Sequence, residues 1–263
     1  MQISGEEIML KLLEIELELP LNEKISSFMG SVMHGVLMEI ISSNVAARLH
    51  EENLRPFSQC VYFDSEKNKS IWRIGTLNAE AYDSIILPLL ERKIIFVKQK
   101  DYKIKLKDHR VLLDTSYENL ADEIFPTSEI PLRADFQFLT ATSFKRDGGY
   151  VIFPENFLVL QSLLQRWNTF SPKMKIEENN LAEKLSTFCK ISRYNLHSQK
   201  FSLEQKYITG FAGKISISFV GNETVNKIVG LLAKFAPFAG IGIKTALGMG
   251  AVSSEIFFRR DLI

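Results

Sequence analysis

The chain has 263 residues, of which 46% are hydrophobic and 24% charged, as in an ordinary globular protein. Its formal net charge of +1 does not by itself indicate a nucleic-acid binder. No apolar run reaches the roughly 18 residues of a membrane span, and no basic start precedes an apolar segment, so we expect neither membrane insertion nor export. Cys60 and Cys189 form no CxxC pair and the four histidines form no HExxH motif. We therefore expect no disulfide, no metal site, no cofactor and a cytoplasmic location.

The first half predicts the order strand, helix, strand, strand, helix, strand. Apolar and polar residues alternate over 8–19, which is typical of a half-buried strand. From 25 to 40, apolar residues recur every three or four positions and predict an amphipathic helix. Asn44 can cap a short second helix that ends near Glu52. Further elements are predicted at 60–63, 71–77, 79–90 and 94–97, followed by a basic, alternating stretch to 113.

Two prolines and several acidic residues between 117 and 131 predict a link, so we place one domain at 1–125 and another at 126–263. The same order of elements then recurs. Strands are predicted at 136–144, 191–196, 213–220 and 251–258, and helices at 155–167 and 224–235. Two βαββαβ copies without obvious sequence identity predict an α+β protein with two tandem ferredoxin-like domains.

Positive charge is concentrated in two stretches, 98–110 and 190–206. Such strips can follow a phosphate backbone even when acidic residues elsewhere cancel the net charge. From charge alone, a solvent-exposed strand face is the favoured interpretation. Phe201 and Tyr207 lie in the basic region before Gly210 and could stack a base, although aromatic side chains more often belong to the core.

The join between the last predicted helix and the last strand is rich in glycine, with Gly240, Gly242, Gly248 and Gly250 within eleven residues. Glycine permits a positive φ and lets another backbone approach closely. Such a loop can offer backbone N–H groups to phosphates, and Lys244 adds a positive charge. The spacing differs from the dinucleotide-binding GxGxxG, and no parallel βαβ unit surrounds it.

Several segments resemble, in order along the chain, the CRISPR repeat-processing ribonucleases of the RAMP superfamily, most strongly those of type III systems. The sequence GIGIKTALGMG at 240–250 resembles the C-terminal glycine-rich loop of RAMP proteins. The segments at 33–39, 49–51 and 55–58 resemble the N-terminal region of these enzymes, and those at 143–145, 150–154, 160–163 and 210–213 resemble their second domain. The resemblance implies duplicated ferredoxin folds, binding of repeat RNA in precursor crRNA, and cleavage without a metal ion.

His34 and His50 are the candidate catalytic residues. At about 100° per residue, His34 falls opposite the apolar stripe of the 25–40 helix, so we expect it outside the core. His50 lies near the end of the short helix, where the helix dipole favours protonated histidine. The resemblance implies that the histidine of the 49–51 segment carries the chemistry in some relatives, and that one on the preceding helix, where His34 lies, carries it in others. We rank His50 slightly ahead and leave open which histidine is acid and which is base.

Three basic residues complete the predicted site. Arg55 resembles the position of a basic partner in the family; as arginine it can clamp a phosphate but cannot act as a general acid near neutrality. Lys145 and Arg146, beside the turn at 148–149, are predicted RNA contacts, although a basic hairpin tip explains them equally well.

For the cleavage of repeat RNA that the resemblance implies, we expect attack by the ribose 2′-OH, which gives 2′,3′-cyclic phosphate and 5′-OH ends. Histidine suits both proton transfers because its ordinary pKa lies near the working pH. The guides would then pass to a CRISPR effector complex, and formation of a homodimer is left open. The main alternative is a non-catalytic RAMP subunit that binds crRNA in an effector complex, which does not require two titratable histidines. A third is a ferredoxin-like regulator that binds a small metabolite.

Overall fold

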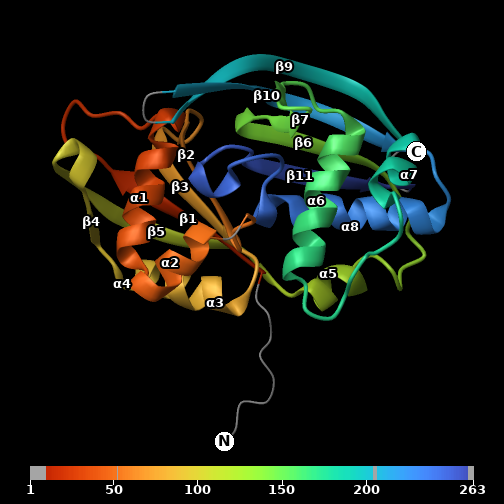
Figure 1. Cartoon of the computed structure of the whole chain (residues 1–263), viewed down its shortest axis with the longest axis horizontal. Coiled ribbons are helices and arrows are strands. Elements are labelled where there is room, and N and C mark those ends of the chain that lie inside the picture. Colours follow the sequence, from red (N-terminus) through yellow and green to blue (C-terminus); the bar gives the residue numbers. More distant parts are fainter. Residues whose placement is uncertain (1–9, 52, 204–205, 260–263) are drawn as a thin grey trace, which may run out of the picture.

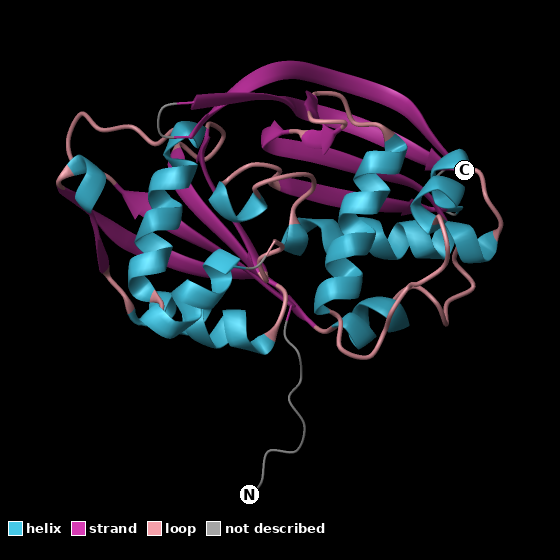
Figure 2. Cartoon of the chain, in the orientation of Figure 1, coloured by secondary structure: helices cyan, strands magenta, loops and turns pink. Residues whose placement is uncertain are grey.

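Two antiparallel sheets, each covered on one face by helices, lie side by side (Figures 1 and 2). The computed structural model describes residues 10–51, 53–203 and 206–259, except the side chains of Ser27, His50 and Glu51. None of the described helices has the length and apolar character needed to cross a bilayer.

The first sheet has five strands in the order β2-β3-β1-β5-β4. They are β1 (Leu10–Glu18), β2 (Phe57–Asp64), β3 (Lys69–Thr76), β4 (Ile94–Val97) and β5 (Tyr102–Thr115). The helices are α1 (Gly30–Ile40), which follows a 3-10 turn at Ser27–Met29, then α2 (Ser43–Glu51), α3 (Ala79–Ala81) and α4 (Leu87–Glu91), with a π turn at Tyr82–Ile86 between the last two. The apolar stripe predicted for α1 is confirmed, since Met33 and Leu37 are buried in one core cluster with Ile15 and Trp72.

The strand at 94–97 was predicted to close the sheet of the first half, and the structure corrects this prediction. β4 lies at the edge, and the basic stretch forms β5, which pairs with β1 along most of its length. A four-residue strand cannot satisfy the backbone groups of the nine-residue β1, whereas the 14-residue β5 can, and it adds Ile104 and Leu106 to the core. The first half is therefore a ferredoxin-like unit with an additional edge strand.

The second sheet has the strand order β11-β6-β10-β9, which is the ferredoxin-like order in full. Its strands are β6 (Pro131–Thr142), β9 (Cys189–Leu203), β10 (Lys206–Phe219) and β11 (Val252–Phe258), and a small hairpin is formed by β7 (Phe144–Arg146) and β8 (Gly149–Val151). The helices are α5 (Tyr117–Asp122), α6 (Asn156–Phe170), α7 (Leu181–Thr187) and α8 (Glu223–Ala239). α5 lies within the predicted link, and β9 and β10 arch from this half towards the first (Figure 1).

The two halves share a hydrophobic core. Leu10 and Leu77, from the first half, belong to the cluster that is built around Trp167 and Phe235 of the second. Tyr117 joins these aromatic rings, with its centroid 4.8 Å from that of Trp167 and 5.7 Å from that of Phe235. Because the core crosses between the halves, their relative position is fixed by packing as well as by the chain connection.

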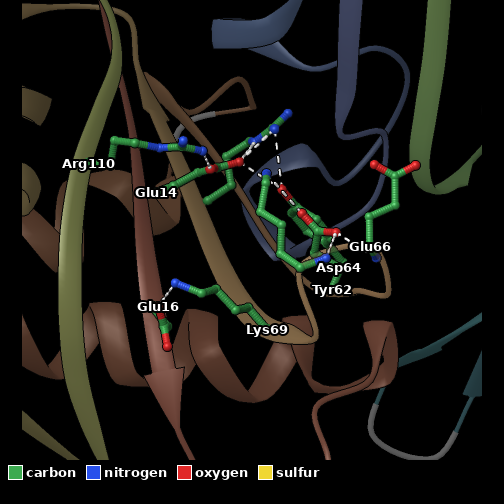
Figure 3. A network of polar contacts seen from close by, with 9 residues as sticks. Glu14, Glu16, Tyr62, Asp64, Glu66, Lys69 and Arg110 are labelled. Carbon is green, nitrogen blue, oxygen red and sulfur yellow. Dashed lines mark hydrogen bonds and ion pairs between the residues drawn. The ribbon is translucent and has the colours of Figure 1, made fainter.

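A network of charged side chains lies along β1 and its neighbouring strands (Figure 3). The Glu14 carboxylate pairs with Arg73 and Arg110, both at 2.7 Å, and accepts a hydrogen bond from the Tyr62 hydroxyl at 2.7 Å. Burial of the Glu14 carboxyl favours its protonated form, but the charge of Arg73 and the hydrogen bonds outweigh this and hold its pKa below the ordinary value. Lys105 and Arg110 of the basic stretch thus lie opposite acidic residues of β1, in agreement with a strand-face interpretation.

Replacing Glu14 with glutamine should leave Arg73 buried without its counter-charge and lower the free energy of unfolding by about 3 kcal/mol at pH 7. The pKa of Glu14 is lower in the folded protein than in the unfolded chain, where it is about 4.3. The Glu14 carboxylate therefore stabilises the fold fully above about pH 4.3, and this stabilisation is lost as the pH falls through the pKa of the folded protein. In urea unfolding, the difference between wild type and Glu14→Gln should shrink below about pH 4. Glu16→Gln is the control, because Glu16 pairs with the more exposed Lys69. This substitution should lower the free energy of unfolding by less than about 1 kcal/mol. Equal losses for both variants would contradict the prediction.

Candidate functional site

The glycine-rich loop that follows α8 lies between α1 and α6, where the two halves meet (Figure 1). Ile241 belongs to the core cluster of the second half, whereas Ala246, in a 3-10 turn at Thr245–Leu247, belongs to that of the first. The loop backbone is therefore packed into both halves.

Close backbone contacts explain the glycines of this loop. At Gly248, where φ is +113°, a Cβ atom would lie 2.8 Å from the Gly30 Cα at the start of α1. At Gly242, where φ is +87°, it would lie 2.4 Å from the Ser143 carbonyl oxygen. A side chain at either position would clash with backbone atoms. The positive φ at these positions would strain the residue as well.

The N–H groups of all four glycines of the loop already donate to groups of the protein. The Gly242 N–H donates to Ser162 Oγ at 2.8 Å, and the Gly250 N–H donates to the Ala141 carbonyl at 3.0 Å. The amides of Gly240 and Gly248 donate to carbonyls of the preceding turn. Because these donors are already used, the glycines contribute shape, and positively charged side chains are left to bind anions.

Gln59 is a buried residue that sequence analysis missed. Its Nε2 donates to the carbonyls of Gly30 at 2.8 Å and Ala246 at 3.2 Å, and its Oε1 accepts from Trp72 Nε1 at 3.1 Å. The amide thus ties the start of α1 to the glycine-rich loop. A glutamine just before the predicted strand at 60–63 carries no sequence signal for such a role, because both acceptors come from distant parts of the chain.

His34 is buried, with 8% of its surface exposed, so the expectation that it lies outside the core is wrong. Its ring stacks on Phe57, with 6.0 Å between centroids and 12° between ring planes. The helical-wheel argument assumed solvent on the face of α1 opposite its apolar stripe. One turn before His34, however, Gly30 touches the backbone of Leu247 and Gly248. The C-terminal loop therefore packs against α1, and a wheel drawn for one helix cannot predict this.

His50 lies in the last turn of α2, and its side chain is outside the described part of the structure. Arg55 follows shortly after, and its Nε donates to the carbonyl of Leu49 at 3.1 Å. This hydrogen bond holds the guanidinium against the turn that carries His50. The His34 ring approaches the same segment through Phe57, two residues after Arg55.

A hollow of about 550 Å³ lies where this segment, α6, the β7–β8 hairpin and the glycine-rich loop meet. It brings together four basic side chains, Arg55, Lys145, Arg166 and Lys244. Its other described lining residues are Asn53, Leu54, Tyr150, Ser162, Gln165, Gly242, Ile243, Thr245, Ala246 and Leu247, none of them acidic. Because the hollow has four cations and no carboxylate among its described lining residues, it is suited to binding phosphate groups.

Not all predicted residues reach the hollow. Arg55, Lys145, Gly242 and Lys244 line it, whereas Arg146 points to Glu155 and forms an ion pair with two contacts of 2.5 and 2.8 Å. His34 is also absent from the described lining. Arg166 was not predicted, because it reads as an ordinary polar position of an amphipathic helix.

Known proteins of similar sequence share one description. The family profile described as CRISPR-associated endoribonuclease Cas6 matches residues 136–252. A protein of that name from Streptococcus thermophilus is 29% identical over 222 residues, covering 84% of this chain and 89% of its own length. Another from Mycobacterium tuberculosis is 28% identical over 249 residues, covering 95% and 79%. The chain is similar to Cas6 endoribonucleases over most of its length. This confirms the resemblance to RAMP repeat-processing enzymes.

Solved Cas6 structures share the fold. A Cas6 product complex superposes with a TM-score of 0.76 at 23% identity and covers 95% of this chain and 100% of its own. Cas6 from Thermus thermophilus gives a TM-score of 0.71 at 22% identity, with the same coverage. The prediction of an α+β fold with tandem ferredoxin-like units is therefore confirmed.

Proposed function

We propose that the chain is a metal-independent endoribonuclease that cuts CRISPR repeat RNA within precursor crRNA. The observation that carries the proposal is the hollow with four cations, which lies at the junction of the two ferredoxin-like units in a chain similar to Cas6 proteins. The similarity to proteins named endoribonucleases, and to a structure described as a product complex, supports cleavage as the activity.

The proposed reaction uses the RNA's own sugar. A general base takes the proton of a ribose 2′-OH, and the 2′-oxygen attacks the adjacent phosphorus. The bond from phosphorus to the 5′-oxygen breaks, and a general acid protonates that leaving oxygen. The products are a 2′,3′-cyclic phosphate and a 5′-OH, and no water or metal ion is consumed.

The proton-transfer group is assigned first to His50, because the segment that follows it, Asn53–Arg55, lines the hollow. His34 is the second proton-transfer candidate, with its ring held on Phe57 beside the same segment. Arg55 and Lys244 would stabilise the negative charge that grows on the phosphorane oxygens. Positioned cations act strongly here because they need no reorganisation during the reaction.

Cleavage in EDTA tests this function. A labelled repeat RNA incubated with the protein and excess EDTA should be cut at one position, and the upstream product should resist a phosphatase that removes 3′-monophosphates until acid opens its cyclic phosphate. A non-catalytic RAMP subunit would retain the RNA without cutting it. Cleavage that stops in EDTA and returns only with magnesium would contradict the proposal.

Lys244→Ala should weaken binding of a non-cleavable repeat RNA and reduce the slope of log affinity against log salt by about 0.7, the value for one lost contact to a single strand. Binding would be measured between 50 and 200 mM salt. Lys214→Ala, an exposed lysine on β10 outside the described lining of the hollow, is the control and should leave the slope unchanged.

A further inference from the structure

Arg166 is a buried cation that the reaction above does not use. It lies on α6, is 5% exposed, and lines the hollow. Its Nη2 lies 3.5 Å from the Gly242 carbonyl oxygen, at the limit of a hydrogen bond, and its Nη1 is buried with no hydrogen-bond partner among the described residues. Within the same part of the chain, no carboxylate forms an ion pair with it.

Arg73 also has a buried Nη1 with no hydrogen-bond partner among the described residues, so what distinguishes Arg166 is the lack of a counter-charge. Arg73 is also buried, but it pairs with Glu14 at 2.7 Å and donates to the Tyr62 hydroxyl at 3.3 Å. Burial without a counter-charge disfavours the charged guanidinium and lowers the pKa of Arg166 to about 10, so the group remains protonated at neutral pH. A buried, unpaired charge destabilises the fold, and an anion beside it would remove that cost.

The position of Arg166 is fixed by α6 and the glycine-rich loop. One turn earlier on α6, Ser162 Oγ accepts the Gly242 N–H at 2.8 Å, so the Gly242 peptide is held against the helix beside Arg166. The exposed Lys145 and Lys244 line the same hollow from two other elements. A buried guanidinium thus shares the hollow with more exposed lysines, and its planar fork fits two oxygens of one phosphate.

We propose that Arg166 anchors a phosphodiester subsite, in which one phosphate of the bound RNA occupies the hollow and supplies the counter-charge that the protein lacks. This rests on the proposed function, because it takes RNA as the ligand. It assigns Arg166 to binding and not to the proton transfers. The anchored phosphate would fix the register of the strand relative to the histidine segment.

The first test needs no RNA. Arg166→Met keeps an unbranched stem, although a shorter one, and removes the charged guanidinium, so it should raise the thermal midpoint of the free protein by about 3 °C. Inorganic phosphate should raise the midpoint of the wild type with the logarithmic dependence of a single site, and it should raise that of Arg166→Met only by the smaller, non-specific effect of a salt. The matched control is Arg146→Met, because Arg146 is exposed and paired with Glu155, and this variant should keep the phosphate response.

The second test uses a repeat RNA with 2′-deoxyribose at the cut site, so that binding is read without cleavage. Arg166→Met should bind it at least tenfold more weakly at 150 mM salt, Arg166→Lys should recover part of the loss, and Arg146→Met should change affinity less than twofold. A purely structural arginine predicts a lower midpoint together with weaker binding, and that result would overturn the proposal. Unchanged RNA affinity in Arg166→Met would also overturn it, even if free phosphate binds. Failure of the wild type to cut normal RNA would instead count against the proposed function.

Discussion

His50→Ala should lower the single-turnover rate of repeat-RNA cleavage by about 10²–10⁴-fold, the usual contribution of a positioned general acid or base. The loss should fall on the chemical step, because the cations of the hollow that bind the RNA remain in place. Affinity for a non-cleavable repeat RNA should therefore change less than about threefold. His197→Ala is the matched control, since His197 is an exposed histidine on β9, and its rate should equal that of the wild type. A His50→Ala enzyme that cuts at the wild-type rate would remove His50 from the mechanism.

His34→Ala separates chemistry from packing. Because the ring is buried against Phe57, its removal should lower the free energy of unfolding by about 1–3 kcal/mol as well as the rate. The rate must therefore be measured well below the thermal midpoint of the variant. A loss of cleavage that persists there with RNA binding intact assigns His34 to the reaction, whereas joint loss of cleavage and binding indicates misfolding.

Gly248→Val should have the largest effect on stability, about 3–5 kcal/mol in urea unfolding. Valine at φ +113° is strained by roughly 1–2 kcal/mol, and its Cβ would also lie 2.8 Å from the Gly30 Cα. Because Gly30 begins the helix that carries His34, the clash should displace the loop or α1 and weaken RNA binding together with stability.

Gly148→Val is the control for this substitution. Gly148 also has a positive φ, +79°, but a Cβ there would meet nothing within 4 Å. The control should therefore cost only the backbone strain, about 1–2 kcal/mol, and leave RNA binding unchanged. If both valine variants lost the same stability, close approach of the loop to α1 would not be the reason for glycine at 248.

Local patterns predicted those parts of the fold that depend on one element at a time. The apolar stripe of α1 and the order of elements in the second half follow from periodicity, and the structure confirms both. β9 and β10 were predicted too short, because much of β9 is exposed and its residues do not alternate. The basic, alternating stretch was expected to present a strand face, but its pairing with β1 as β5 was not predicted, because its outward side chains are mainly charged and one strand alone does not reveal its neighbour.

The candidate site could be predicted only in part, because it is assembled from distant segments. Arg55, Lys145 and Lys244 were found by motif resemblance, and the hollow brings them together. The burial of His34 depends on a loop more than two hundred residues later in the chain. Arg166 gives no signal in sequence, since only its position beside Gly242 distinguishes it from other polar residues of α6.

The identity of the nucleophile is the central claim, and replacing one sugar oxygen tests it directly. A repeat RNA with a single 2′-deoxyribose on the 5′ side of the scissile phosphate should bind with unchanged affinity and remain intact. The same replacement one nucleotide downstream should be cut normally. Cleavage of the first substrate at the normal position would show that another nucleophile attacks the phosphorus, and would contradict the account.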